Sequence, residues 1–183
     1  IDRGIYLVPE DRKRSGLLLD VSITGNISLP DMAHHSTAGI VRPESEIRNA
    51  ERQRDSLNIR TPGVANEVGA LSGGNQQKVV LAKWLSMEPR VIIFDEPTRG
   101  VDVGAKAEIY RLMRELAARG NVILMISSDM EEILHMSERV AVMHEGEITG
   151  ILERQDCTEE NVMTLAVGPL AAGQRAAAAH AAA

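Results

Sequence analysis

The sequence contains almost no cysteine and few aromatic residues. Cys157 is the only cysteine among 183 residues, which excludes an internal disulfide framework and a cysteine zinc site. This usage fits a reducing cytosol. Aromatic residues make up only 2% of the chain, whereas apolar residues make up 44%. A packed core must therefore be built mainly from leucine, isoleucine, valine, alanine and methionine.

Long apolar runs and blocks of basic charge are also absent. No apolar run approaches the roughly 20 residues of a membrane-spanning helix, and no signal peptide is visible. The net charge is −6 and the 20 basic residues are scattered along the chain, which argues against nucleic acid as a partner. The chain begins with Ile1-Asp2-Arg3 rather than with methionine, so we expect it to be part of a longer protein.

Two stretches carry most of the chemical information. Residues 71–77, Leu-Ser-Gly-Gly-Asn-Gln-Gln, predict a glycine-rich turn that opens into a helix, which the side chain of Ser72 can cap. A helix N-terminus presents unpaired N–H groups and the positive end of the helix dipole, so it attracts phosphate. Residues 91–94 predict a buried strand, which Asp95 and Glu96 follow. Carboxylates at a strand end can hold Mg²⁺ and polarise a water molecule. Together the two stretches predict nucleotide hydrolysis.

Short apolar runs alternate with amphipathic segments, which predicts an α/β fold with a mostly parallel sheet. The expected strands are 5–8, 91–94 and 122–126, and the second is expected to be covered on both faces. Glu145-Gly146 predicts the turn of a hairpin over residues 140–152. Residues 10–14 and 31–43 are expected to be loops. The expected helices are 22–29, 44–58, 73–87, 104–119, 129–136 and 158–167.

The ordered pair of stretches resembles two motifs of the ABC-type ATPases. Residues 71–75 resemble the signature sequence Leu-Ser-Gly-Gly-Gln, and residues 91–96 resemble a Walker B motif. The resemblance implies a P-loop NTPase fold with a helical signature lobe, and it implies ATP and Mg²⁺ as cofactors. In this family the signature closes over ATP that the facing ATPase domain holds. The residues to which it gives this binding role are Ser72, Gly73, Gly74, Asn75 and Gln76.

The resemblance also assigns roles to three carboxylates. It implies that Asp95 binds Mg²⁺ and that Glu96 orients and deprotonates the attacking water as the catalytic base. Asp102 falls in the position of the D-loop, which crosses the dimer interface. Simpler interpretations exist for all three: the strand ends in two acids at its rim, and Asp102 caps the next helix. For Asp102 both roles can hold.

Two positions depart from the family pattern. Glu10 stands where the Q-loop glutamine is expected, and an ionised glutamate accepts hydrogen bonds but donates none. Metal contact by Glu10 stays open, whereas glutamine-like behaviour is not expected. Ser128 stands where the family usually has a histidine that senses the γ-phosphate. A serine can bind phosphate but carries no charge, so hydrolysis here is expected to be slow or absent. Alternatively, Ser128 caps the helix that begins near Asp129.

A closer resemblance covers residues 4–168. Residues 10–13 and 95–104 are similar to the second ATPase half of the two-domain subunits that drive bacterial sugar importers of the ribose, galactose and xylose type. This implies ATP hydrolysis coupled to carbohydrate transport at the cytoplasmic face of the plasma membrane. The implied partners are a second ATPase domain, transmembrane permease subunits and, indirectly, a periplasmic or extracellular sugar-binding protein.

The same resemblance divides the chain. Residues 1–15 begin the ATPase core, residues 16–88 form the helical signature lobe, and residues 89–168 complete the core. The alanine-rich residues 169–183 are expected to be a disordered tail.

Two other functions stay open. The first is an ABC-type ATPase without a transport role, such as a translation or repair factor. Such proteins would not be expected to contain both runs at 10–13 and 95–104. The second is a catalytically degenerate half that completes the ATP site of a partner domain, which Glu10 and Ser128 favour.

The P-loop is absent from this sequence. That motif requires Gly-x-x-x-x-Gly-Lys followed by serine or threonine, because backbone amides and the lysine cradle the phosphates. None of the four lysines follows a glycine or precedes serine or threonine. They are Lys13, Lys78, Lys83 and Lys106. We expect the P-loop to lie upstream of the first strand, so that the sheet lacks a strand and leaves apolar surface exposed.

We predict that the 183-residue chain alone binds ATP weakly or not at all and does not hydrolyse it, because it lacks a phosphate cradle. Isothermal titration calorimetry with ATP measures this affinity. A clear micromolar affinity would contradict the prediction.

Overall fold

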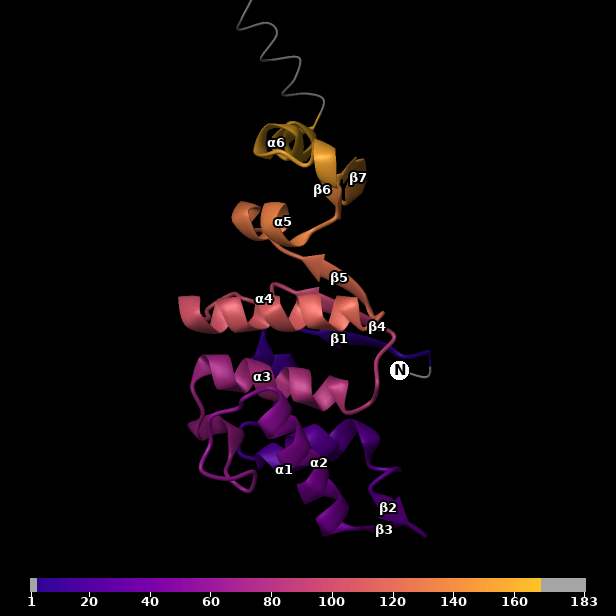
Figure 1. Cartoon of the computed structure of the whole chain (residues 1–183), viewed down its shortest axis with the longest axis vertical. Helices are drawn as coiled ribbons and strands as arrows, with labels where there is room; N and C mark the ends of the chain where they lie inside the picture. Colours follow the sequence, from indigo (N-terminus) through magenta and orange to yellow (C-terminus); the bar gives the residue numbers. More distant parts are fainter. Residues whose placement is uncertain (1–2, 169–183) are drawn as a thin grey trace, which may run out of the picture. The chain divides into compact units, whose positions relative to one another are not determined.

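The computed structural model describes residues 3–168. The expected tail at 169–183 lies outside these residues. The chain divides into two compact units, the first ending at Ile126 and the second beginning at Ser127. Each is described by itself in the following paragraphs (Figure 1). Among the described residues, no helix combines the length and hydrophobicity that crossing a membrane requires.

The first unit is built on a parallel sheet of three strands in the order β1-β4-β5. These strands are β1 (Ile5–Val8), β4 (Val91–Asp95) and β5 (Val122–Ile126). The predicted α/β fold and its three strands are therefore confirmed. Because the strands run in the same direction, their carboxyl ends lie at one edge of the sheet, where ligands bind in open α/β folds. Asp95 ends β4 at this edge, and Glu10 follows β1 at the same edge.

The two faces of this sheet differ in exposure. Side chains alternate along a strand, and the in-register pairing gathers Tyr6, Ile92 and Phe94 on one buried face. Helices α3 (Gly73–Leu85) and α4 (Val103–Ala118) contact the sheet at β1 and β5 respectively. On the other face, Leu7 and Leu124 are 46% and 52% exposed. The predicted exposed apolar surface is thus confirmed.

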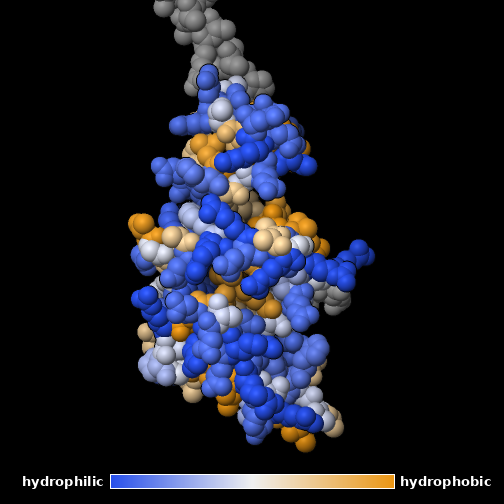
Figure 2. Space-filling model, viewed as in Figure 1, coloured by the Kyte–Doolittle hydropathy of each residue, from blue (hydrophilic) through white to orange (hydrophobic). Residues whose placement is uncertain are grey.

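This open face corrects one expectation. β4 is not covered on both faces, since Val91 and Ile93 are only half-buried. The alternation of buried and open positions continues across all three strands. Apolar side chains reach the surface of the protein at several places in Figure 2. The exposed members of the open face are Ile5, Leu7, Val122, Leu124 and Ile126.

Residues 16–88 contribute three packed helices, α1 (Ile23–Ser28), α2 (Pro43–Ser56) and α3, with 3-10 turns at Leu29–Asp31 and Val68–Ala70. Ser22 caps α1 because its Oγ accepts a hydrogen bond from Gly25 N at 3.0 Å. Asn26 is fully buried, and its side-chain amide bonds to the backbone of Leu18, Val21 and Ser22. These bonds fix the entry to α1. The division of the chain at 15/16 and 88/89 stays a prediction.

Two of the expected loops contain regular structure. Within residues 31–43, a small hairpin pairs β2 (Ser36–Thr37) with β3 (Ile40–Val41). Ala38 and Gly39 both have positive φ, 52° and 80°, which is the backbone of a tight hairpin turn. The charged run after β1 forms a single π-helical turn, η1 (Arg12–Gly16). Asp11 caps η1, since its Oδ1 accepts hydrogen bonds from Lys13 N and Arg14 N at 3.0 and 3.1 Å.

The second unit contains α5 (Met130–Met136), β6 (Arg139–His144), β7 (Glu147–Glu153), a 3-10 turn at Arg154–Asp156 and α6 (Glu159–Val167). The predicted hairpin is confirmed: β6 and β7 pair antiparallel around Glu145 and Gly146, whose φ values are 48° and 85°. α6 packs on this hairpin, and Val140, Val142 and Val162 form the buried core of the unit.

We predict that Leu124→Thr reduces self-association of the chain without unfolding it. The side chain is 52% exposed on the open face, so its replacement removes apolar surface without leaving a cavity. Sedimentation velocity measures the association. As a control, Ile92→Ala, at a position 1% exposed in the neighbouring strand, should lower the free energy of unfolding by about 2–5 kcal/mol in urea. Equal destabilisation by both variants would show that Leu124 is not on an open face.

Candidate functional site

The glycine-rich turn forms the start of α3, as predicted. Ser72 occupies the N-cap position and is exposed. The expected side-chain cap is wrong, however, because Ser72 Oγ accepts its hydrogen bond from Asn75 Nδ2 at 2.9 Å and not from a backbone amide. No side chain among the described residues caps the first turn, so the amides of Gly73 and of the buried Gly74 have no hydrogen-bond partner there.

Asn75 sets the direction in which Ser72 can donate a hydrogen bond. The Asn75 Oδ1 atom accepts from Arg60 N at 2.9 Å. A backbone N–H can only donate, so this contact fixes the orientation of the amide. Nδ2 must then face Ser72 and donate to it. Because the Ser72 oxygen is the acceptor in that bond, its own proton remains free to point outward.

Gln76 does not lie on the surface that Ser72 forms. Its side chain is buried, 5% exposed, and its Nε2 donates to the carbonyls of Val68 and Leu71 at 3.3 and 3.2 Å. These contacts hold the turn that leads into the glycines. Gln76 therefore supports the turn from inside, in contrast to the binding role that the resemblance implies for it.

The two glycines allow other segments to approach α3 closely. A Cβ atom at Gly73 would lie 2.7 Å from Arg12 Nη2, and one at Gly74 would lie 2.8 Å from Ala105 Cβ. Carbon atoms do not approach other heavy atoms this closely without overlap. A side chain at Gly74 would therefore displace α4, whereas one at Gly73 would push the end of the Arg12 side chain aside.

The segment after β4 lies beside these glycines. Asp102 caps α4, since its Oδ1 accepts from Ala105 N at 3.0 Å; the interpretation as a helix cap is confirmed. Its other oxygen, Oδ2, lies 3.7 Å from the Cβ position of Gly74, and the carbonyl oxygen of Gly100 lies 3.7 Å from that of Gly73. We call the group Ser72, Gly73, Gly74, Gly100 and Asp102 the signature surface.

The strand-end carboxylates lie at the carboxyl edge of the sheet. Asp95 is the last residue of β4, and its side chain makes no hydrogen bond or ion pair within the described part of the chain. Glu96 adopts φ of 46° and its amide donates to Ile126 O at 2.9 Å. Positive φ is unfavourable for a residue with a side chain and often marks functional turns. The sheet thus holds Glu96 in a defined, strained position directly after Asp95.

Glu10 reaches the same edge from β1. Its carboxylate forms an ion pair with Arg99, which follows β4. Sequence reasoning did not identify Arg99 as a partner, because 89 positions separate the two residues. The positive charge of Arg99 therefore lies beside Glu10, the residue that replaces the expected glutamine.

Ser128 lies in the second unit and is exposed. The alternative interpretation, in which it caps the following helix, is wrong. Asp129 is the N-cap of α5, and its side chain accepts from Glu131 N and Glu132 N at 3.1 and 3.4 Å. The carboxylate of Asp129, one residue after Ser128, reaches these amides directly, so the serine is not needed for capping.

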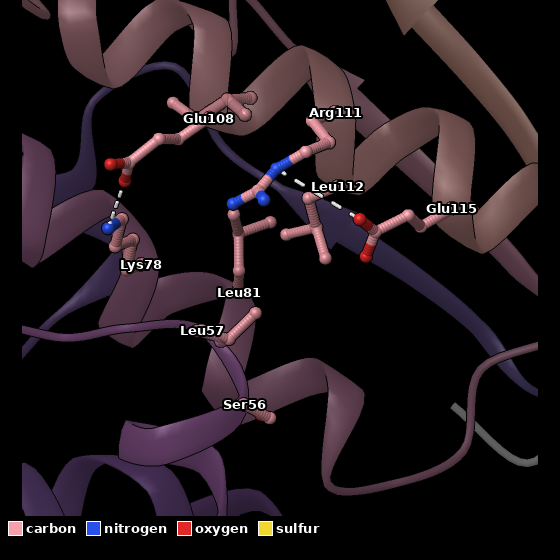
Figure 3. A pocket seen from close by; sticks show the side chains of 9 residues that line it. Ser56, Leu57, Lys78, Leu81, Glu108, Arg111, Leu112 and Glu115 are labelled. Atoms are coloured by element: carbon pink, nitrogen blue, oxygen red, sulfur yellow. Dashed lines mark ion pairs between the residues drawn. The ribbon is translucent and has the colours of Figure 1, made fainter.

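A pocket between α3 and α4 is lined by side chains that hold the two helices together (Figure 3). Lys78 is 7% exposed, forms an ion pair with Glu108 and donates to Asn58 O at 3.0 Å. Arg111 and Glu115 form a second ion pair along its rim. Because these charges are already matched, the pocket offers no unpaired group to a ligand. Its lining residues are Ser56, Leu57, Lys78, Leu81, Glu108, Ile109, Arg111, Leu112 and Glu115.

The helix start offers free amides and a hydroxyl, and the parallel sheet beside it has carboxylates at its edge. This combination is typical of α/β proteins that bind the phosphates of a nucleotide. Comparison with known proteins identifies the class. The ABC transporter family matches residues 4–99, and the chain belongs to this family.

Relatives with assigned names are similar over most of the chain. The ribose import ATP-binding protein RbsA of Lactococcus lactis subsp. lactis is 54% identical over 171 residues, which cover 92% of this chain. RbsA 1 of Streptomyces coelicolor is 52% identical over 174 residues, and RbsA of Bacillus subtilis is 48% identical over 168 residues; each covers 92% of this chain. The chain spans only 34% of the length of these relatives.

Solved structures share the fold. A dimeric ATP-binding cassette in a post-hydrolysis state, bound to ADP and Pi, has a TM-score of 0.68 at 22% identity, covering 82% of this chain and 62% of that one. Another ATP-binding cassette of an ABC transporter has a TM-score of 0.70 at 20% identity, covering 88% of this chain and 68% of that one. At these identities the likeness establishes the fold alone.

We predict that Asn75→Asp retains the stability of the turn but reverses the Ser72 hydrogen bond. One carboxylate oxygen can still accept from Arg60 N, whereas the other can only accept, so the Ser72 hydroxyl must donate to it. In urea unfolding, this variant should stay within about 1 kcal/mol of the parent, whereas Asn75→Ala should cost about 1–2 kcal/mol through two lost hydrogen bonds. Equal losses would contradict the assigned bonds.

Proposed function

We propose that this chain is part of an ATP-hydrolysing subunit that energises import of a carbohydrate through an ABC transporter. The single observation that carries the proposal is the signature surface, where the signature and D-loop segments lie together at the open start of α3. The names of the relatives, which are ribose import ATP-binding proteins, supply the class of transported substrate.

The signature surface would bind the phosphates of ATP held by a second ATPase domain. The amides of Gly73 and Gly74 and the outward hydroxyl of Ser72 are donors that match phosphate oxygens. Helix α3 adds the positive end of its dipole. The nucleotide that this surface meets would be held by the second domain. The dimeric ATP-binding cassette with the same fold supports this arrangement.

The edge carboxylates fit a magnesium ion that arrives with the nucleotide. In residues 3–168, no group of three His, Cys, Asp or Glu side chains is placed to hold a metal ion by itself. Mg²⁺ is usually held by one or two carboxylates, with water and substrate phosphates completing its shell. Asp95, whose carboxylate has no other partner in the described chain, would be that ligand. When bound, the ion would neutralise phosphate charge.

Glu96 would orient and deprotonate the attacking water, and its fixed backbone suits a residue that must not move with solvent. Ser128, in the second unit, would be the hydroxyl contact to the γ-phosphate in place of the usual histidine. Asp102 would meet the second domain across the interface. Permease subunits in the membrane and, beyond them, a sugar-binding protein would be the other partners, with the subunit at the cytoplasmic face.

A second candidate function is a non-hydrolysing half that only completes the ATP site of its partner. The ion pair between Glu10 and Arg99 favours it, because Glu10 is then engaged by an arginine where the family's glutamine would meet the nucleotide. Ser128 in the histidine position points the same way.

The test is a chimera in which residues 4–168 replace the matching segment of the Lactococcus lactis relative, produced in a strain that lacks that protein. We predict that the chimera restores ribose uptake. Ser72→Ala should lower uptake by about ten-fold or more, since it removes a donor to the transferring phosphate. Ser86→Ala, at the far end of α3, is the matched control and should have no effect.

Glu96→Gln in the same chimera separates the two candidates. If this half hydrolyses ATP, uptake falls with Glu96→Gln as it does with Ser72→Ala; if it only completes the partner's site, Glu96→Gln leaves uptake unchanged. A chimera that reaches the membrane in normal amount but transports no ribose would refute the carbohydrate-import proposal.

A further inference from the structure

We propose that Arg12 is a further phosphate-binding residue of the signature surface. The inference rests on the proposed function and names a residue to which the resemblance assigns no role. Arg12 is half-buried, whereas Asp11, Lys13 and Arg14 around it in the sequence are exposed. One basic side chain of the charged turn is therefore directed inward, onto α3.

The backbone of η1 is fixed beside α3 at several points. Asp11 caps the turn. At its other end, a Cβ atom on Gly16 would lie 3.0 Å from Val80 Cγ2, so the chain passes close to the middle of α3. Lys83 Nζ then donates to Gly16 O at 3.1 Å, and burial lowers the pKa of this lysine. Arg12 projects from a turn whose position is set by these contacts.

The guanidinium of Arg12 lies directly against Gly73. Its Nη2 is 2.7 Å and its Cζ 3.6 Å from the position that a Cβ of Gly73 would occupy. Its Nε is buried and has no hydrogen-bond partner within residues 3–168. A buried N–H group without a partner costs free energy, and a bound anion is one of the few arrangements that account for it in a native protein. The fork of donors is thus placed at the first residue of the signature helix.

The positive charge of Arg12 also offsets a negative charge on this surface. The Asp102 carboxylate lies beside Gly74, and on its own it would repel a phosphate. The half charge at the start of α3 offsets this only in part. A guanidinium carries a full positive charge at every accessible pH and binds phosphate through paired N–H donors. With Arg12 included, the positive groups at the helix start exceed the negative ones.

Packing alone is the competing explanation, in which the guanidinium merely fills the space that Gly73 leaves. It predicts that the charge and donors of Arg12 are irrelevant to a bound phosphate. The two explanations differ in binding, so the test uses the full 183-residue chain and inorganic tripolyphosphate as the probe, at the millimolar concentrations that the weak binding expected of the isolated chain requires. Binding is followed by NMR through the amide signals of Gly73 and Gly74 and the side-chain N–H signal of Arg12.

We predict that Arg12→Gln weakens tripolyphosphate binding by about ten-fold, because a charge-assisted hydrogen bond to phosphate is roughly twice as strong as a neutral one. Arg12→Lys should weaken it by about three-fold, since the charge remains but the paired geometry is lost. Arg14→Gln removes an exposed arginine from the same turn. Because salt screens exposed charges, this change should have little effect on binding at physiological ionic strength. The urea midpoint of each variant reports its folding.

The outcomes separate this inference from the function on which it rests. Supporting results are a loss of affinity in Arg12→Gln that exceeds that of Arg14→Gln, and a shift of the Arg12 signal in parallel with those of the glycines. If Ser72→Ala weakens binding but Arg12→Gln does not, Arg12 only packs and the signature surface stands. If neither change alters binding, the signature surface itself is refuted.

Discussion

The close approach of three segments at Gly73 and Gly74 is the constraint on which the candidate site depends. The turn η1, the start of α3 and the start of α4 meet where a Cβ atom would overlap Arg12 or Ala105. Because glycine has no side chain, segments from distant parts of the sequence can share one surface at these two positions. The first turn of α3 has no side-chain cap, because Ser72 Oγ accepts its hydrogen bond from Asn75. Backbone freedom is secondary here, because α3 is helical from Gly73 onward.

The donors and the acids of the site occupy different parts of the first unit. Donors gather at the start of α3, whereas Asp95, Glu96 and Glu10 follow the carboxyl ends of adjacent parallel strands. A triphosphate needs a cradle of donors next to its metal-binding acids. Under the proposed function, the donors at the start of α3 would meet the phosphates of ATP held by a second domain. Two-fold association would then give each domain the donors of the other.

The sequence predicted what depends on local patterns. The strands, the long helices and the hairpin at Glu145-Gly146 follow from apolar periodicity and turn residues. It did not predict contacts between distant residues, such as Glu10 with Arg99 or Arg12 with Gly73, because no local pattern encodes them. Two errors concern competition among polar groups: Ser72 and Ser128 were candidate caps, but Asn75 and Asp129 offered stronger or better-placed partners. The β2–β3 hairpin was missed since only Ala38-Gly39 marks its turn.

The replacement of glutamine by Glu10 raises the question of how the sheet edge tolerates a third acid. Glu10, Asp95 and Glu96 all follow strand ends at this edge, and a bound triphosphate would add several negative charges. Arg99 neutralises Glu10 through their ion pair, and Mg²⁺ would balance Asp95 together with the phosphates. The edge then differs from one with a neutral glutamine mainly by the lost hydrogen-bond donor, not by net charge. Under the proposed function, a half with this edge would hold metal and nucleotide without the hydrogen-bond donor that a glutamine would supply, which suits a domain that closes over ATP without having to cleave it.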